Sequence, residues 1–283
     1  MLRKLIKQEF KATARLMLPL YLAVILLGLG AKLAEVVLNA TDTSSGGVFA
    51  GFGMPGQVMD FLDVLSVLVV TGFVVALIAA FAVSFVLMIM RFRNNLLGDE
   101  GYVMFTLPVS VHQLVWSKLI VSLVWFVGAV VVDGVAILLV LMGDEFTFSQ
   151  LFPAIASFFS QFTSGQAAHF VGFTAEGLLL AVILTFSCCL EFYAAMAIGH
   201  SFAKHKGLLS VVFFFAISAA SEVISSVLML GANKLGLTIQ LDSFSQLANA
   251  HLLMAALLVI NLIFAGVLYF LTTYMLKNRL NLE

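Results

Sequence analysis

The chain has 283 residues, of which 62% are apolar and only 10% are charged, and its formal net charge is −1. An average soluble domain carries about a quarter charged residues, so this composition excludes a soluble globular protein. A disordered chain is excluded as well, because such chains are poor in apolar residues. The two cysteines are too few for a disulfide framework or a cysteine-rich metal site, and the net charge gives no indication of a nucleic-acid partner. The remaining class is a membrane protein, whose solvent is lipid.

Six apolar runs are long enough to cross a bilayer, because a transmembrane helix needs about 20 apolar residues. They cover Met17–Leu38, Val58–Met90, Leu119–Met142, Val171–Ile198, Leu208–Leu230 and Leu252–Leu276. The period-2 alternation of an outer-membrane β-barrel is absent from these runs. We therefore predict an all-α polytopic protein with six transmembrane helices, which form a single transmembrane domain over residues 1–283.

The distribution of lysine and arginine predicts the orientation of these spans. Twelve of the 14 basic residues fall on one side, and only Lys32 and Lys234 fall on the other. Because cytoplasmic loops are enriched in basic residues, both termini are predicted to be cytoplasmic. We therefore expect a multi-pass protein of the cell membrane.

Residues 1–15 predict an amphipathic helix that lies on the inner leaflet. At 3.6 residues per turn, one face carries the basic residues Lys4, Lys7, Lys11 and Arg15. Basic side chains attract anionic headgroups while the apolar side chains dip below them. Glu9 falls within the apolar arc. We interpret it as one half of a salt bridge to a neighbouring lysine, since such pairs are common on helix surfaces, and a contact to a cytoplasmic partner is the alternative.

The predicted outer connections are short. Residues 39–57 are rich in Gly, Ser and Thr, which is typical of a flexible connector. Residues 143–170 form a longer outer loop, and its aromatic and apolar part at 151–162 predicts an interfacial or re-entrant segment. Neither connection is long enough for a folded extracellular domain.

The cytoplasmic segment at residues 91–118 carries the most specific pattern in the chain. The acidic pair Asp99 and Glu100 predicts the start of a short helix, because acids at a helix N-terminus interact favourably with the helix dipole. This helix would carry Tyr102–Phe105. Pro108 ends it, because proline cannot continue the hydrogen-bond ladder.

A second helix is predicted to begin at Ser110. Ser110 and Gln113 have the spacing of a capping box, and Val109 and Leu114 have that of a hydrophobic staple. This helix continues into the third span, so the loop joins a short helix rigidly to a transmembrane helix. Such an arrangement can transmit a displacement of the short helix to the transmembrane helix. The same pattern also fits a well-capped connection without a mechanical role.

Common catalytic and nucleotide-binding motifs are absent. The chain has no G-x-x-x-x-G-K-[ST] phosphate loop, no H-E-x-x-H metalloprotease motif and no G-x-S-x-G nucleophile elbow. The five histidines are scattered among loops and span ends, so no metal site is predicted. Adjacent Cys188 and Cys189 point to different sides of one helix and are interpreted as packing residues. We expect a non-catalytic chain that binds no cofactor itself.

Asp133, Glu191 and Glu222 lie well inside the predicted spans, away from their first turns. Acids in spans are costly, and they usually face the bundle interior or a wet cavity. One interpretation is a proton relay or a cation-binding site with a role in transport. The other is a set of polar or protonated groups that form hydrogen bonds across helices.

Several segments resemble the membrane subunits of ATP-binding cassette (ABC) exporters of the bacterial type-2 class. Gly98–Ser110, with the sequence GDEGYVMFTLPVS, together with His112–Leu114 and Ser117–Lys118, resembles the first cytoplasmic loop of these permeases. Leu5–Lys11 is similar to their N-terminal connecting helix, and Ile198–Gly207 is similar to their second cytoplasmic loop. Six spans with both ends inside also fit this family, so the resemblance covers the whole chain.

The resemblance implies a permease subunit that forms an export pathway and is driven by a separate ABC ATP-binding subunit, which holds ATP and Mg²⁺. It implies a dimer with a second permease copy or a paralogue. The coupling helix that contacts the ATPase would comprise Asp99, Glu100, Tyr102, Val103, Phe105 and Thr106. The second cytoplasmic loop would contribute His200, Lys204, His205 and Lys206. The phenylalanine-rich spans are compatible with hydrophobic substrates such as lipids, drugs or peptides, without selecting among them.

Three other functions compete with this hypothesis. A stand-alone ion-coupled secondary transporter would use Asp133, Glu191 and Glu222. A polytopic membrane enzyme would need paired catalytic groups at one depth, and the sequence offers none. An anchor or sensor subunit would bind a partner without moving a substrate.

Overall fold

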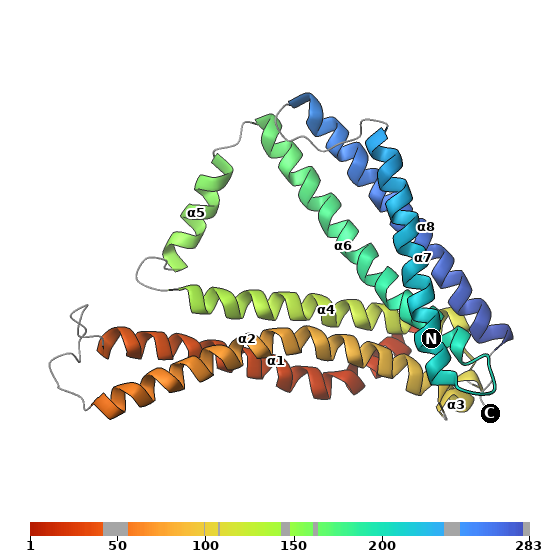
Figure 1. Ribbon diagram of the computed structural model, residues 1–283, viewed down its shortest axis with the longest axis horizontal. Helices are drawn as coiled ribbons and strands as arrows, with labels where there is room; N and C mark the ends of the chain where they lie inside the picture. Colours follow the sequence, from red (N-terminus) through yellow and green to blue (C-terminus); the bar gives the residue numbers. More distant parts are fainter. Residues whose placement is uncertain are drawn as a thin grey trace. The chain divides into compact units, whose positions relative to one another are not determined.

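The computed structural model describes residues 1–41, 56–98, 100–106, 108–142, 148–160, 164–234 and 244–279. Over these ranges the chain folds into α-helices and one π-helical turn, without a strand (Figure 1). The elements are α1 (Leu2–Thr41), α2 (Gly56–Phe92), η2 (Arg93–Leu97), α3 (Glu100–Thr106), α4 (Val111–Leu141), α5 (Phe148–Ser160), α6 (Ser164–Gly199), α7 (Lys206–Lys234) and α8 (Phe244–Asn278). The predicted all-α fold is confirmed.

Within the described residues, six helices are long and apolar enough to cross a membrane: α1, α2, α4, α6, α7 and α8. Each matches one of the six apolar runs predicted from the sequence, although the third run, Leu119–Met142, extends one residue beyond α4. In each of these helices, at most 33% of the residues in the most apolar 18-residue stretch are buried within the chain. Apolar helices with so little protein cover require a lipid solvent. The chain is therefore a multi-pass membrane protein.

The basic N-terminal segment and the first span form one continuous helix, α1, rather than a separate helix over residues 1–15 followed by a span. The predicted basic face is present, because its lysines and arginine are all exposed. The buried residues recur every three or four positions, at Leu5, Glu9, Thr13, Met17, Tyr21 and Val24. This spacing defines a single helix face. That face runs through both segments without interruption, which explains why the helix does not break between them.

One compact unit of the fold comprises Phe10–Leu87 and Val124–Ser157. Trp125 of α4 holds α1 in this unit: its indole N–H donates a hydrogen bond to Thr13 Oγ1 at 2.7 Å, and its ring stacks on Phe10 at a centroid distance of 4.8 Å. The Tyr21 hydroxyl donates a hydrogen bond to the Trp125 carbonyl at 2.6 Å. In a lipid-covered helix pair, such bonds satisfy polar groups that water does not reach.

The other compact unit comprises Met1–Glu9, Met88–Leu123 and Phe158–Glu283. Within it, α6 packs against both α7 and α8, as Figure 1 shows. The rings of Phe92 and Tyr193 are fully buried and stack at a centroid distance of 3.9 Å, which joins the end of α2 to α6. The predicted cytoplasmic site residues that the structure describes all belong to this unit.

The outer loop predicted at residues 143–170 contains α5, which is 13 residues long. This helix is too short to cross the hydrocarbon core, and its length is typical of an interfacial or re-entrant segment. The connector predicted at residues 39–57 falls largely outside the described residues.

Candidate functional site

The predicted coupling segment forms a π-helical turn, a short helix and a capped long helix in chain order. Helix α3 begins at Glu100, as the acidic pair predicts, and it ends at Thr106, before Pro108. Asp99 lies outside the described residues. Helix α2 passes directly into η2, a π-helical turn that the sequence did not predict, and α3 packs against η2. π-helical turns are rare in proteins, and those that occur are often found at functional sites.

Ser110 caps α4, as its spacing from Gln113 predicts. The Gln113 N–H donates a hydrogen bond to the Ser110 hydroxyl at 3.3 Å, and the Leu114 N–H donates one to the Ser110 carbonyl at 3.2 Å. These bonds satisfy backbone donors that a helix start otherwise leaves unpaired. The cap fixes the point at which the loop becomes a transmembrane helix.

The surface of α3 is unusually apolar for a segment outside the spans. Tyr102 and Val103 are 53% and 65% exposed, and Glu100 and Thr106 are exposed beside them. Phe105 is half-buried. An exposed apolar patch rimmed by polar side chains is typical of a protein interaction site. Of the predicted partner-contact residues that the structure describes, all but Phe105 are exposed.

A buried ion pair lies at the base of this loop. The Lys118 ammonium donates a hydrogen bond to Glu9 Oε1 at 2.7 Å, and the Asn95 amide donates one to the same oxygen at 3.0 Å. The Lys118 and Glu9 side chains are only 3% and 9% exposed. Three elements therefore meet at one carboxylate: α1 through Glu9, η2 through Asn95 and α4 through Lys118.

The salt bridge expected for Glu9 is thus present, but its partner is a lysine 109 positions along the chain rather than a neighbour on the same helix. Charge-assisted hydrogen bonds are short and strong, and breaking a buried ion pair from one side is costly. The pair therefore ties α1 to α4, and Asn95 ties η2 to the same carboxylate.

The predicted second cytoplasmic loop brings the end of α6 against the start of α7. A Cβ at Gly199 would lie 2.5 Å from the Ser210 backbone nitrogen, so only glycine permits this approach. His200 is buried, with Nδ1 2.9 Å from the Met196 carbonyl oxygen. Burial lowers the pKa of His200, and the positive charges of Arg93 and Lys206 lower it further.

The remaining predicted residues of this loop differ in exposure. Lys204 is exposed, and Lys206 is half-buried at the first position of α7. His205 is exposed and adopts a positive φ of 58°, which is uncommon for a residue other than glycine. Its carbonyl accepts the Leu209 N–H at 2.9 Å, so this strained residue forms the start of α7.

The three acids of the spans have different surroundings. Asp133 is 6% exposed, and neither of its carboxylate oxygens has a hydrogen-bond partner among the described residues. Glu191 is half-buried and accepts a hydrogen bond from the Ser218 hydroxyl. Glu222 lies in a helix long and apolar enough to cross a membrane, but it is exposed in the single chain, as is every residue of α7 from Glu222 to Leu230. The second half of α7 therefore lacks cover from the described part of the chain.

A histidine cluster that the sequence did not predict joins α6 to α8. His251 Nδ1 lies 2.8 Å from a Glu176 carboxylate oxygen, and His251 Nε2 lies 3.0 Å from His169 Nδ1. Phe173 stacks on the His251 ring at 3.9 Å. The histidines are 82 positions apart, so no local spacing signals their contact. Within the described residues, no group of three or more His, Cys, Asp or Glu side chains is placed to hold a metal ion.

Comparison with known protein families, curated proteins and solved structures finds no significant match to this chain.

Proposed function

We propose that this chain is the permease subunit of an ABC transporter of the bacterial type-2 exporter class. In this role it forms the pathway for export of a hydrophobic substrate, such as a lipid, drug or peptide, and a separate ATP-binding subunit drives it. Helix α3 carries the proposal, because it is short, has exposed Tyr102 and Val103 side chains, and packs on η2. Through Asn95, η2 contacts the buried ion pair between Glu9 of α1 and Lys118 of α4.

The proposed mechanism transmits force through these contacts. Two ATP-binding subunits close on ATP and Mg²⁺ and push the α3 helix seated on each of them. The push reaches η2, which α3 contacts, and passes through Asn95 to Glu9 and Lys118. Helices α1 and α4 then tilt as one body, because separating the buried charges is costly. This chain supplies no catalytic group to ATP hydrolysis.

The outer half of α7 supports the proposed pairing with a second permease subunit. Glu222 is exposed on a transmembrane helix, and a carboxylate facing lipid at the bilayer centre costs about 2.5–3.5 kcal/mol. In a polar pathway between two permease subunits, this carboxylate would contact water or protein rather than lipid. In the proposed function Glu222 therefore faces the pathway between the two permease subunits.

Reconstitution with the ATP-binding subunit of a neighbouring gene tests the proposal. The chain is co-purified with that subunit, and ATP turnover is measured in liposomes. We expect stable assembly, and we expect Glu100→Ala with Phe105→Ala to lower turnover. Val171→Ser, which changes a valine on the predicted outer side that is 62% exposed, is the control and should leave turnover unchanged. Normal assembly and turnover in the double variant would contradict the coupling role.

A stand-alone ion-coupled transporter is the second candidate, and Asp133 favours it. A buried carboxylate whose oxygens have no hydrogen-bond partner among the described residues is a group that a proton or cation can occupy. Proton-coupled flux in liposomes without any ATPase would support this candidate. Loss of that flux in Asp133→Asn would assign it to this residue.

A further inference from the structure

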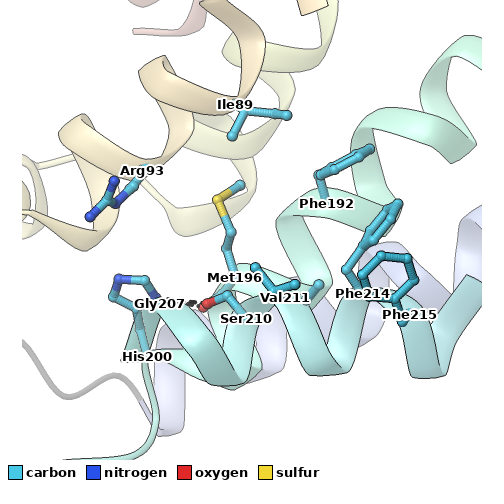
Figure 2. A pocket seen from close by; sticks show the side chains of 11 residues that line it. Ile89, Arg93, Phe192, Met196, His200, Gly207, Ser210, Val211, Phe214 and Phe215 are labelled. Atoms are coloured by element: carbon cyan, nitrogen blue, oxygen red, sulfur yellow. Dashed lines mark hydrogen bonds between the residues drawn. The ribbon is translucent and has the colours of Figure 1, made fainter. Parts of the chain in front are cut away.

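An apolar pocket with one charged end lies at the predicted cytoplasmic end of the unit that contains α6 and α7. Its volume is about 370 Å³, within the range of small-molecule sites. Its apolar lining includes Ile89, Phe192, Met196, Val211, Phe214 and Phe215. Figure 2 shows the three phenylalanines together on one side and Arg93 with His200 at the other end. The pocket is therefore amphipathic along its length.

Arg93 supplies the charge at the polar end. It is the first residue of η2, its side chain is exposed, and no carboxylate of the described residues pairs with it. The pocket lining contains neither Asp nor Glu. A guanidinium binds phosphate through two parallel hydrogen bonds, so this end is suited to a phosphate group.

His200 and Lys206 shape the same end. Burial lowers the pKa of His200, so its ring is neutral near pH 7 and contributes hydrogen bonding rather than charge. Lys206, the first residue of α7, adds a second positive charge that acts on His200 together with that of Arg93. Arg93 remains the one cation within the lining itself.

We propose that this pocket binds one anionic phospholipid of the cytoplasmic leaflet, with an acyl chain among the phenylalanines and the phosphate on Arg93. The predicted orientation places the pocket at the inner membrane surface, where anionic lipids gather. Basic pockets between transmembrane helices on this side bind anionic head groups. A soluble anion would not use the apolar lining, whereas each buried CH₂ of an acyl chain adds to binding. The proposal does not depend on the transport function.

The bound lipid would join two parts of the same unit. Ile89 and Arg93 come from α2 and η2, and the rest of the lining comes from α6, α7 and their connection. Because α3 packs on η2, the lipid would hold the base of the coupling loop against the end of α6. Loss of the lipid would therefore loosen the coupling loop.

Native mass spectrometry of the full chain in detergent tests the site, with dioleoyl-phosphatidylglycerol and dioleoyl-phosphatidylcholine as probes. Both lipids offer a phosphate to Arg93, but the quaternary ammonium of the zwitterionic lipid cancels its net charge and is repelled by the guanidinium. We therefore expect one molecule of the anionic lipid to bind about tenfold more tightly than the zwitterionic lipid. Arg93→Gln should remove this preference. Val211→Trp should weaken binding of both lipids, because Val211 lines the pocket and is 55% exposed, so that the larger ring fills the pocket without disturbing the core.

Arg91→Gln is the matched control, because Arg91 lies two positions away on the same stretch of chain and does not line the pocket. It should keep the preference for the anionic lipid within about twofold, because the half-buried Arg91 lies outside the pocket lining. If Arg91→Gln and Arg93→Gln reduced the preference for the anionic lipid equally, the proposal would be overturned, since this would indicate general charge attraction. Displacement of the lipid by millimolar glycerol 1-phosphate would also overturn it, by identifying a soluble anion as the ligand.

Discussion

The buried contact between Glu9 and Lys118 gives a sharp prediction of stability. Their side chains are 9% and 3% exposed, and the charged atoms lie 2.7 Å apart. Glu9→Ala leaves the Lys118 ammonium buried without its counter-ion, and it also removes the acceptor of the Asn95 amide. Breaking a buried ion pair from one side costs about 3–5 kcal/mol. We expect Glu9→Ala to lower the free energy of unfolding by that amount.

An exposed ion pair on the same helix provides the control. Lys32 and Glu35 lie 2.9 Å apart, but their side chains are 21% and 47% exposed. Exposed pairs contribute about 0–1 kcal/mol, because water solvates each charge when its partner is removed. Glu35→Ala should therefore change the unfolding free energy several-fold less than Glu9→Ala does.

The double variant Glu9→Leu with Lys118→Met separates the cost of an unpaired charge from the value of the pair. Replacing both partners with apolar residues leaves no buried charge, so the double variant should be more stable than Glu9→Ala. The assay is reversible unfolding in mixed micelles with increasing dodecyl sulfate, followed by tryptophan fluorescence. The reasoning is refuted if Glu9→Ala costs no more than Glu35→Ala.

Three further predictions concern the predicted cytoplasmic end. Gly199→Ala should destabilise the chain by about 1–3 kcal/mol, because the added Cβ would lie 2.5 Å from the Ser210 backbone nitrogen. Gly177→Ala in the same helix should be neutral or slightly stabilising, since nothing lies within 4 Å of its Cβ. Burial lowers the pKa of His200 in the folded chain, so the unfolded chain binds the proton more readily, and stability should decrease as the pH falls below about 6.5. His200→Gln should remove that part of the pH dependence. Tyr102→Ser should leave the unfolding free energy within about 0.5 kcal/mol of wild type and lower ATP turnover in the assembled transporter.

Each of these predictions has a contradicting result in the same assays. Equal stability of Gly199→Ala and Gly177→Ala would show that α7 moves aside without cost. An unchanged pH profile in His200→Gln would assign the pH dependence to another group. A loss of stability in Tyr102→Ser would mean that this side chain supports the fold rather than a partner contact.

The sequence predicted the features that depend on local chemistry. The six spans follow from the length of the apolar runs, and the structure contains a helix for each. The start of α3 at Glu100 and the cap at Ser110 were predicted equally well, because acids, proline and capping residues act on backbone groups within one turn.

The contacts that organise the site could not be predicted in the same way. Glu9 and Lys118 are 109 positions apart, and His169 and His251 are 82 apart, so no periodicity relates them. The exposure of Glu222 depends on which helices cover α7, and its own sequence does not specify them. The continuity of α1 likewise reflects a buried face made by distant partners, whereas the sequence of residues 1–15 alone indicated a separate surface helix.

Photo-crosslinking from α3 in native membranes tests the central claim most directly. A photoreactive residue is placed at Val103 on α3, which is 65% exposed, and at Val171 on the predicted outer side, which is 62% exposed. The crosslinked proteins are then identified by mass spectrometry. A permease subunit predicts a product between position 103 and a protein that contains a phosphate-loop motif, and no such product from position 171. Crosslinks from position 103 only to lipid or to other copies of this chain would contradict the account.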